Sequence, residues 1–436
     1  MKFSTLFKTL LLSGMMAGSC IPASAAEKVT MADIDFHQAG GNYYCYPWLH
    51  KDPPAQTPAP KGYVPFHLEH SGRHGSRWLI GYHHYDRSLE LLEKGERNGK
   101  LTPLGKKVLE TVRKIRKDAD GREGELSDNG ALQHQGIGKR MAKNYPTIFT
   151  DSTNLDARAT NVIRSILSMF NGLNGIQSVV PAINIKTDAS NADMWYMNHN
   201  DEEAWKARSK AQDEEWKFYG RHKNKGAYLN RLFNDPQFAK DSIGDHLFNH
   251  LYSVLVNTQS HSDQPWLVEE VFTIDEARER WSERNIAWFL NAGNSKLTDN
   301  RMPFVQSNLL QDIIACVDTA INSNVPSVNL RYSHDTVVLP LASVMELNNV
   351  FEEINDFEEL GEKGWHDYRV VPMAANIQIV FYRKPGSHDI NDVLFKVLLN
   401  EQEVTLPFKA VTGPYYRWKD AKEYYSKKIA PYVSKK

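Results

Sequence analysis

The sequence has little cysteine, almost no excess charge and no long apolar run. Its 436 residues include three cysteines, and its formal net charge is −1. Three cysteines allow at most one disulfide bond, and a balanced charge provides no overall field that would attract nucleic acid or an anionic membrane. The lack of a span-length apolar stretch argues against a transmembrane segment. With 41% hydrophobic residues, the chain can bury a large core and form a second domain.

Residues 1–25 are typical of a signal peptide. A basic beginning and a short apolar run, Leu10 to Met16, precede the small residues Ala23-Ser24-Ala25, after which we expect cleavage. The protein is therefore expected to be exported, either to a periplasm or to the medium. A second interpretation stays open. Ala17-Gly18-Ser19-Cys20 resembles a bacterial lipobox and would place a lipid anchor at Cys20 on the outer membrane.

Two cysteines, Cys45 and Cys316, remain after this cleavage. An exported protein could bridge them. Cys316, however, falls in a predicted helix whose apolar side includes Leu309, Ile313 and Val317. We therefore expect a buried free thiol at Cys316.

Two short stretches, far apart in the chain, hold residues suited to phosphate chemistry. The first is Arg73-His74-Gly75-Ser76-Arg77, and the second is Ser333-His334-Asp335-Thr336. Planar guanidinium groups grip phosphate oxygens in a bidentate way. A neutral imidazole can attack phosphorus, and a carboxylic acid can protonate the departing oxygen. Together the stretches indicate hydrolysis of a phosphate monoester without a metal ion.

Each stretch follows a predicted β-strand. Apolar residues alternate from Val64 to Leu68 before the first stretch, and from Val328 to Tyr332 before the second. Ligands of open α/β sheets bind beyond the carboxyl ends of the strands. We therefore expect both stretches to meet in one crevice.

A predicted helix adds a third arginine. Ile163, Leu167 and Phe170, with Val162 and Ile166, form one apolar face that we expect to pack against the core. Arg164 lies near the beginning of this helix and off that face, where it could face the crevice.

At these positions the chain resembles the histidine acid phosphatases, which form branch 2 of the histidine phosphatase superfamily. Their signature, Arg-His-Gly-x-Arg followed much later by His-Asp, corresponds to Arg73–Arg77 and His334-Asp335. Further family patterns match Arg158 with Arg164-Ser165-Ile166-Leu167-Ser168, Leu126 to Gln133 with Gly138, and a late hairpin from Val397 to Pro407. The resemblance extends from about Phe66 to Pro407.

This resemblance implies both a fold and a site. The fold is α/β, with a Rossmann-like core sheet, helices on both faces and an inserted, mainly helical cap. His74 would be the nucleophile that forms a phosphohistidine, and Asp335 would be the general acid. Phosphate would be bound by Arg73, Arg77, Arg164 and His334. No metal and no other cofactor is expected.

The substrate class is less sharply defined. Trp78 after Arg77 looks like the inositol polyphosphate phosphatase group, although that group usually carries His-Ala-Glu where this chain has His334-Asp335-Thr336. The basic run Arg221–Lys225 could bind a second phosphate. We therefore expect a small-molecule phosphate monoester, with phytate or another inositol polyphosphate preferred. A broad-specificity acid phosphatase or a sugar phosphatase is the alternative.

The placement of these motifs predicts how the chain is divided into domains. We expect an α/β core formed by residues 26–190 and 301–436, interrupted by a helical cap over 191–300. Aromatic residues, including Trp205, Trp216, Phe218 and Tyr228, suggest that this cap is packed.

Two rival interpretations have specific requirements. A metallohydrolase could draw on His67, His70, His83 and His84, but the only nearby acids are Glu69 and Asp86, and no helical His-x-x-x-His accompanies them. A protein that only binds phosphate esters would need the arginines, yet it would need neither His74 nor Asp335. The presence of both favours the enzyme.

Overall fold

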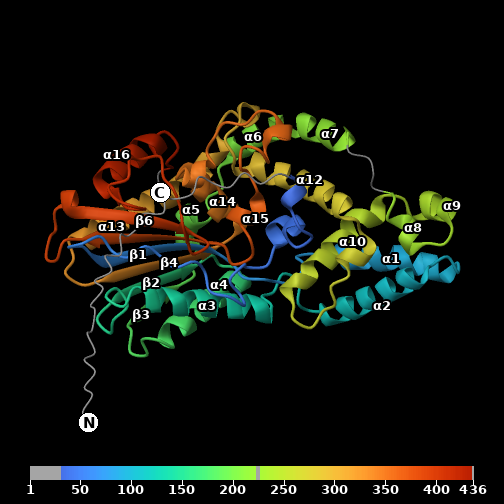
Figure 1. The fold of residues 1–436 in the computed structure, drawn as a ribbon, viewed down its shortest axis with the longest axis horizontal. Coiled ribbons are helices and arrows are strands. Elements are labelled where there is room, and N and C mark those ends of the chain that lie inside the picture. The colour runs from blue at the N-terminus through green and yellow to red at the C-terminus, as the bar shows by residue number, and fades with distance from the viewer. Residues whose placement is uncertain (1–30, 222–225, 435–436) are drawn as a thin grey trace, which may run out of the picture.

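The computed structural model describes residues 31–221 and 226–434, and a mixed sheet of eight strands is the centre of this part of the chain (Figure 1). Its order is β3-β2-β4-β1-β5-β6-β7, and β8 also pairs with β6. The strands from β3 to β1 run parallel to one another, whereas β5 and β6 are antiparallel to their neighbours. The strands are β1 Val64–Arg73, β2 Asn154–Ala159, β3 Ile185–Asp188, β4 Ser327–Ser333, β5 Asn376–Arg383, β6 Val393–Leu399, β7 Gln402–Glu403 and β8 Tyr416–Arg417.

Helices cover both faces of this sheet and form a separate bundle beyond one end of it (Figure 1). This confirms the α/β fold with helices on both faces. The helices are α1 His83–Arg97, α2 Pro103–Asp118, α3 Asp128–Asn144, α4 Ile163–Gln177, α5 Met194–Met197, α6 Glu202–Lys210, α7 Gln212–Arg221, α8 Leu229–Leu232, α9 Pro236–Phe238, α10 His246–Val256, α11 Val268–Val271, α12 Ile274–Ala292, α13 Ser307–Ile321, α14 Asp335–Val344, α15 Asp367–Val370 and α16 Trp418–Ile429.

The two faces of the sheet have different cores. On one face, α13, α14 and α16 pack over β5 and β6, and on the other, α3 and α4 pack over β2 and β4. A β-bulge between Pro65 and His67 interrupts the alternation in β1. As a result Phe66 packs with the first core and Leu68 with the second.

Helices α3 and α4 approach each other closely through glycines. A Cβ atom on Gly138 would lie 2.0 Å from the backbone oxygen of Gly172, so no side chain fits there. The buried face of α4 consists of small and medium residues such as Ser165 and Ser168. The prediction that Ile163, Leu167 and Phe170 face the core is therefore wrong: these side chains are 65%, 42% and 46% exposed. Small residues take the inner face because larger ones would push the helices apart.

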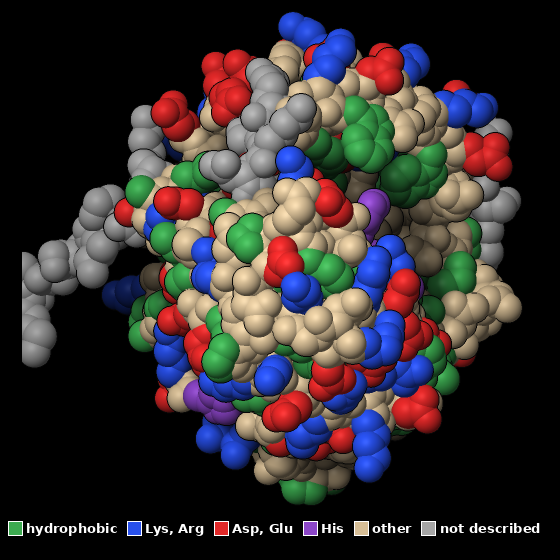
Figure 2. All heavy atoms as spheres, turned by 90° about the vertical axis from the view of Figure 1, so that its right-hand side faces the viewer, with side chains coloured by type: hydrophobic (Ala, Val, Ile, Leu, Met, Phe, Trp, Pro, Cys, Tyr) green, Lys and Arg blue, Asp and Glu red, His purple; other side chains and the backbone are tan. Residues whose placement is uncertain are grey.

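The helical end of the molecule has a core of its own. It joins α1 and α2 to α8, α10 and the first half of α12, so residues well before position 191 take part in it. Tyr228 is buried in this core, and Phe218 is buried in the first core, beside the sheet. Trp205 and Trp216 are 43% and 63% exposed, so the prediction that these two pack inside is wrong. The cap limits of 191 and 300 stay a prediction. Figure 2 shows this end, with basic and acidic side chains interspersed and a histidine visible in a hollow.

Several sequence expectations have simple outcomes. Cys45 and Cys316 are both free and partly buried, so they are not bridged. Within the described ranges, no helix is long and apolar enough to cross a bilayer. The predicted signal peptide, the lipobox cysteine Cys20 and residues 222–225 of the basic run lie outside the described residues.

Candidate active site

The sheet brings the two phosphate-type motifs side by side. Strands β1 and β4 are parallel neighbours, and their registered pairs end with Arg73 opposite Ser333. The backbone N–H of His74 donates to the carbonyl oxygen of Ser333 at 2.9 Å. His74 and His334 therefore follow the carboxyl ends of adjacent strands, and their ring centroids lie 5.7 Å apart. The predicted crevice residues do meet.

His74 is buried and held in a defined orientation. Its Nδ1 lies 2.9 Å from the carbonyl oxygen of Gly75. Because a carbonyl only accepts, Nδ1 carries the proton and Nε2 keeps a lone pair. Burial, followed by the charges of Arg73, Arg77 and Arg164, holds the pKa of His74 well below its usual value. The imidazole is therefore neutral and suited to nucleophilic attack.

Arg73 and Asp335 form an ion pair at the floor of the site. Nη2 of Arg73 lies 2.8 Å from Oδ2 of Asp335, and its Nη1 donates to the carbonyl oxygens of Asn42 and Val371 at 2.6 and 2.7 Å. Burial raises the pKa of Asp335, but Arg73 and Arg77 outweigh it and the pKa is lowered. In the free protein this carboxyl is thus predominantly ionised.

Arg77 and Arg164 each have a guanidinium Nε that is not used in a hydrogen bond to the described residues. Arg77 uses Nη1 on the carbonyl of Trp78 at 2.8 Å, and among the described residues its buried Nε has no hydrogen-bond partner. The Nε of Arg164 is likewise unpaired. Burial and the neighbouring Arg77 lower the pKa of Arg164 to about 10. Unpaired buried donors of one charge next to a histidine are a site for an anion.

His334 completes this group. Its Nε2 lies 3.0 Å from Oγ1 of Thr160, which leaves Nδ1 to interact with a bound anion. Burial and the charge of Arg164 lower its pKa to about 4. Arg158, by contrast, pairs with Asp156 and Asp193 and does not join the phosphate-type residues.

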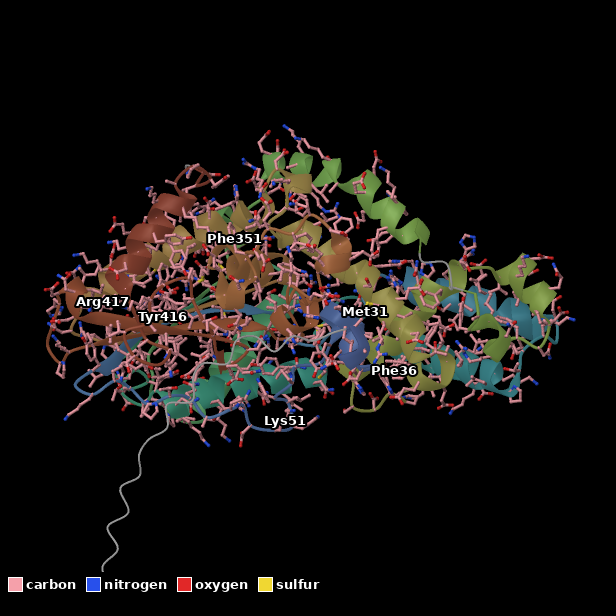
Figure 3. All side chains as sticks on the ribbon, turned by 45° about the horizontal axis from the view of Figure 1, so that its top comes forward. Met31, Phe36, Lys51, Phe351, Tyr416 and Arg417 are labelled. Atoms are coloured by element: carbon pink, nitrogen blue, oxygen red, sulfur yellow. The ribbon has the colours of Figure 1, made fainter. Side chains whose placement is uncertain are left out.

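Three residues near this site carry no signal in the sequence. Nδ2 of Asn42 donates to Oδ2 of Asp335 at 3.1 Å, and the amide oxygen of Asn42 accepts from Nη2 of Arg284 at 2.6 Å. The ring of Tyr43 lies against the guanidiniums of both Arg77 and Arg284, at 5.6 and 4.5 Å from its centroid. Asn42 and Tyr43 follow the segment that contains Met31 and Phe36, which crosses between the sheet and the helical end (Figure 3).

The histidines of the rival metal interpretation do not meet at the site. His67 contacts Glu69 within the sheet at 2.9 Å, and His70 is buried against Tyr332. His83 and His84 lie together at the beginning of α1, beside His250 of α10. No sequence pattern linked His250 to them, because 166 positions separate it from His84.

The arrangement of these side chains indicates a class of site. A neutral, oriented histidine lies among guanidinium groups and a partly buried carboxyl group at the carboxyl ends of parallel strands, which suits phosphoryl transfer. The family model described as "Histidine phosphatase superfamily (branch 2)" matches residues 92–400. The chain belongs to this family and is a phosphomonoesterase. No curated protein matches it.

Solved structures share this fold at low sequence identity. A multiple inositol polyphosphate phosphatase from Bifidobacterium longum, solved with inositol hexasulfate, is 17% identical with a TM-score of 0.70, covering 88% of this chain and 97% of that one. The phytase of D. castellii is 16% identical with a TM-score of 0.67, covering 97% and 91%. The Hafnia alvei phytase with myo-inositol hexakis sulphate is 11% identical with a TM-score of 0.53, covering 87% and 100%.

Proposed function

We propose that the protein is an exported phosphatase that hydrolyses inositol polyphosphates, such as phytate, through a phosphohistidine intermediate. The observation that carries the chemistry is the oriented, neutral imidazole of His74 between Arg73, Arg77 and Arg164. Binding of a phosphate ester alone would not require a histidine with a free Nε2 beside an acid. A function limited to binding would therefore account for the arginines but not for His74 and Asp335.

In the proposed reaction, the arginines and His334 bind the three equatorial oxygens of the phosphoryl group. Nε2 of His74 attacks phosphorus in line, the bond to the ester oxygen breaks, and Asp335 gives its proton to that oxygen. Water then attacks the phosphohistidine while Asp335 takes a proton from it, which releases phosphate and regenerates His74. Fixed guanidinium charge around the transferring group is the largest expected contribution to catalysis.

Substrate binding itself would prepare the acid. The pKa of Asp335 is lowered by Arg73 and Arg77. A phosphate dianion bound by the same arginines offsets their charge, so the pKa of Asp335 rises and the carboxyl takes up a proton. The acid would thus become protonated where a leaving group is present.

The preference for several phosphates rests on a second group of arginines. Arg284 shares the ring of Tyr43 with Arg77, and Arg280 lies close enough to interact electrostatically with Arg284. Within the described part of the chain, Nε of both Arg280 and Arg284 is buried without a hydrogen-bond partner. This positive charge next to the reacting site suits a second phosphate of one substrate. The two structural neighbours solved with hexasulfated inositol support the same class.

Phosphate release from phytate and p-nitrophenyl phosphate tests the substrate. Arg280→Gln should lower kcat/KM for phytate by roughly fivefold to tenfold, since one added phosphate contact is worth about 1 kcal/mol, and should spare p-nitrophenyl phosphate. Arg113→Gln, an exposed arginine paired with Glu93 and Glu96, is the matched control. Equal turnover of both esters by the unaltered enzyme would instead indicate a broad-specificity acid phosphatase. The binding of a second phosphate by the basic side chains of residues 222–225 stays a prediction.

Export has its own test. If the signal peptide is cleaved after Ala25, the mature protein should begin at Ala26 and appear in a soluble exported fraction. A lipidated amino-terminal Cys20 and recovery with membranes would show the lipobox alternative. Recovery of the intact chain from the cytoplasm would contradict both.

A further inference from the structure

Three histidines outside the reacting centre form a cluster for which the phosphatase chemistry gives no reason. His83 and His84 begin α1, and His250 lies on α10. One ring nitrogen of each lies within 4.8 Å of those of the other two. We propose that these three imidazoles form a binding site for a divalent transition metal ion of the Zn²⁺ class. This proposal does not depend on the proposed substrate.

One pair of ring nitrogens has the spacing that a tetrahedral ion requires. Nδ1 of His84 and Nδ1 of His250 are 3.3 Å apart. Two zinc–nitrogen bonds of about 2.05 Å at a tetrahedral angle separate their nitrogens by about 3.3 Å. His83 completes the set, with its ring centroid 4.1 Å from that of His84 and 5.9 Å from that of His250.

The absence of a side chain at Gly81 makes room for the ring of His83. A Cβ atom on Gly81 would come within 2.4 Å of Nδ1 of His83, so the imidazole occupies the space above this glycine. Helix α1 packs extensively against α10, which fixes His84 relative to His250. A ligand set held by two packed helices is more rigid than one held on loops.

Cations also surround the cluster, and they indicate what the fourth ligand would be. Arg87, Arg280, Arg284 and the exposed His246 lie near His84 or His250. Two of these arginines are paired, Arg87 with Glu90 at 2.5 Å and Arg280 with Glu283 at 2.9 Å. Three histidine ligands leave one tetrahedral position open. Beside arginines, that position would take hydroxide or another oxyanion, which offsets the charge of the ion.

Metal binding by the full chain tests the proposal directly. The protein, stripped with a chelator and desalted, should bind one equivalent of Co²⁺ with the intense visible absorption of a tetrahedral ion, and Zn²⁺ should displace it. His84→Ala and His250→Ala should weaken binding about 100-fold or more, since even outer-shell partners of a metal are worth 10–100-fold. His83→Ala, which changes an exposed residue, should also weaken it. His246→Ala, on the same helix, should bind as the unaltered protein does.

The outcomes separate clearly. Thermal unfolding midpoints show whether each variant folds, and the exposed His83 provides a test even where a partly buried histidine is needed for stability. An unaltered protein with no saturable Co²⁺ or Zn²⁺ binding overturns the proposal, as does unchanged binding in the His84 and His250 variants. Orthophosphate that stabilises the protein through these histidines without any metal would make this an anion site instead. Turnover of p-nitrophenyl phosphate by the stripped protein tests the phosphatase mechanism separately, and it should persist.

Discussion

The imidazole of His74 is held by its own neighbour, since its Nδ1 lies 2.9 Å from the carbonyl oxygen of Gly75. Rotation of the ring would break this contact, so Nε2, the atom proposed to react, stays directed away from the backbone. A nucleophile that is fixed before substrate arrives would lose little entropy in the reaction. The position of this histidine is therefore determined by the chain itself and not by the ligand.

His74→Ala should abolish turnover, because we expect no other group to form the covalent intermediate. The fall should be about a thousandfold or more, as in other enzymes that lose their nucleophile. Rapid acid-free quenching of the unaltered enzyme should trap phosphate on His74, identified by peptide mass spectrometry. His50→Ala, an exposed histidine, is the control. Substantial residual activity in the His74 variant would contradict the assignment.

Asp335→Asn should affect substrates according to their leaving groups. A general acid contributes about 10²–10⁴-fold when the departing oxygen needs a proton. The loss should approach that range for alkyl phosphates and be much smaller for p-nitrophenyl phosphate, since nitrophenolate departs without a proton. Steady-state kcat values for both esters provide the measurement. Equal losses would show that Asp335 acts only as the partner of Arg73.

The pH dependence of kcat should follow the same carboxyl group. Only protonated Asp335 can act as the acid, so kcat for an alkyl phosphate should fall as pH rises through its pKa in the complex. As pH falls, protonation of His74 should not lower kcat near the usual histidine pKa, because the pKa of this ring lies well below that value and the ring stays neutral. In Asp335→Asn the fall at higher pH should disappear. A fall that persists in this variant would assign it to another group.

Gly138→Ala should destabilise the fold by about 3 kcal/mol, the upper part of the range for an overpacked core. The new methyl group would meet the backbone oxygen of Gly172, and backbone cannot turn aside as a flexible side chain can. Gly220→Ala on α7, where a Cβ meets nothing within 4 Å, should instead stabilise by about 0.5–1 kcal/mol. Chemical denaturation of both variants would measure this. Similar stability in the two would show that α3 and α4 separate at little cost.

The strands that position the site could be predicted from the sequence, because each strand and the functional loop after it are continuous in the chain. The alternation before Arg73 and before His334 corresponds to β1 and β4. The same approach failed for α4, where the apolar stripe is exposed. Hydrophobicity alone favours large residues inside, yet close helix packing against Gly138 favours small ones.

Other residues of the site could not be found in this way. Asn42 contacts Asp335, and Arg284 contacts Asn42 in turn. Both come from segments that have no motif, and their types are common on protein surfaces. His250 joins His84 only because α10 packs on α1. Contacts of this kind depend on tertiary packing, for which a single sequence offers no periodic signal.

The position of β1 in the sheet also sets the order in which the enzyme can be made. This strand carries Arg73, but its two neighbours, β4 and β5, begin at Ser327 and Asn376. A ribosome must therefore synthesise some 250 further residues, on the order of half a minute at about 5–20 residues per second, before the strand gains its first partner. Until then His74 has no Ser333 carbonyl to fix its backbone and no Asp335 within reach. The residues of the proposed site therefore cannot meet until the chain has been synthesised beyond Asp335.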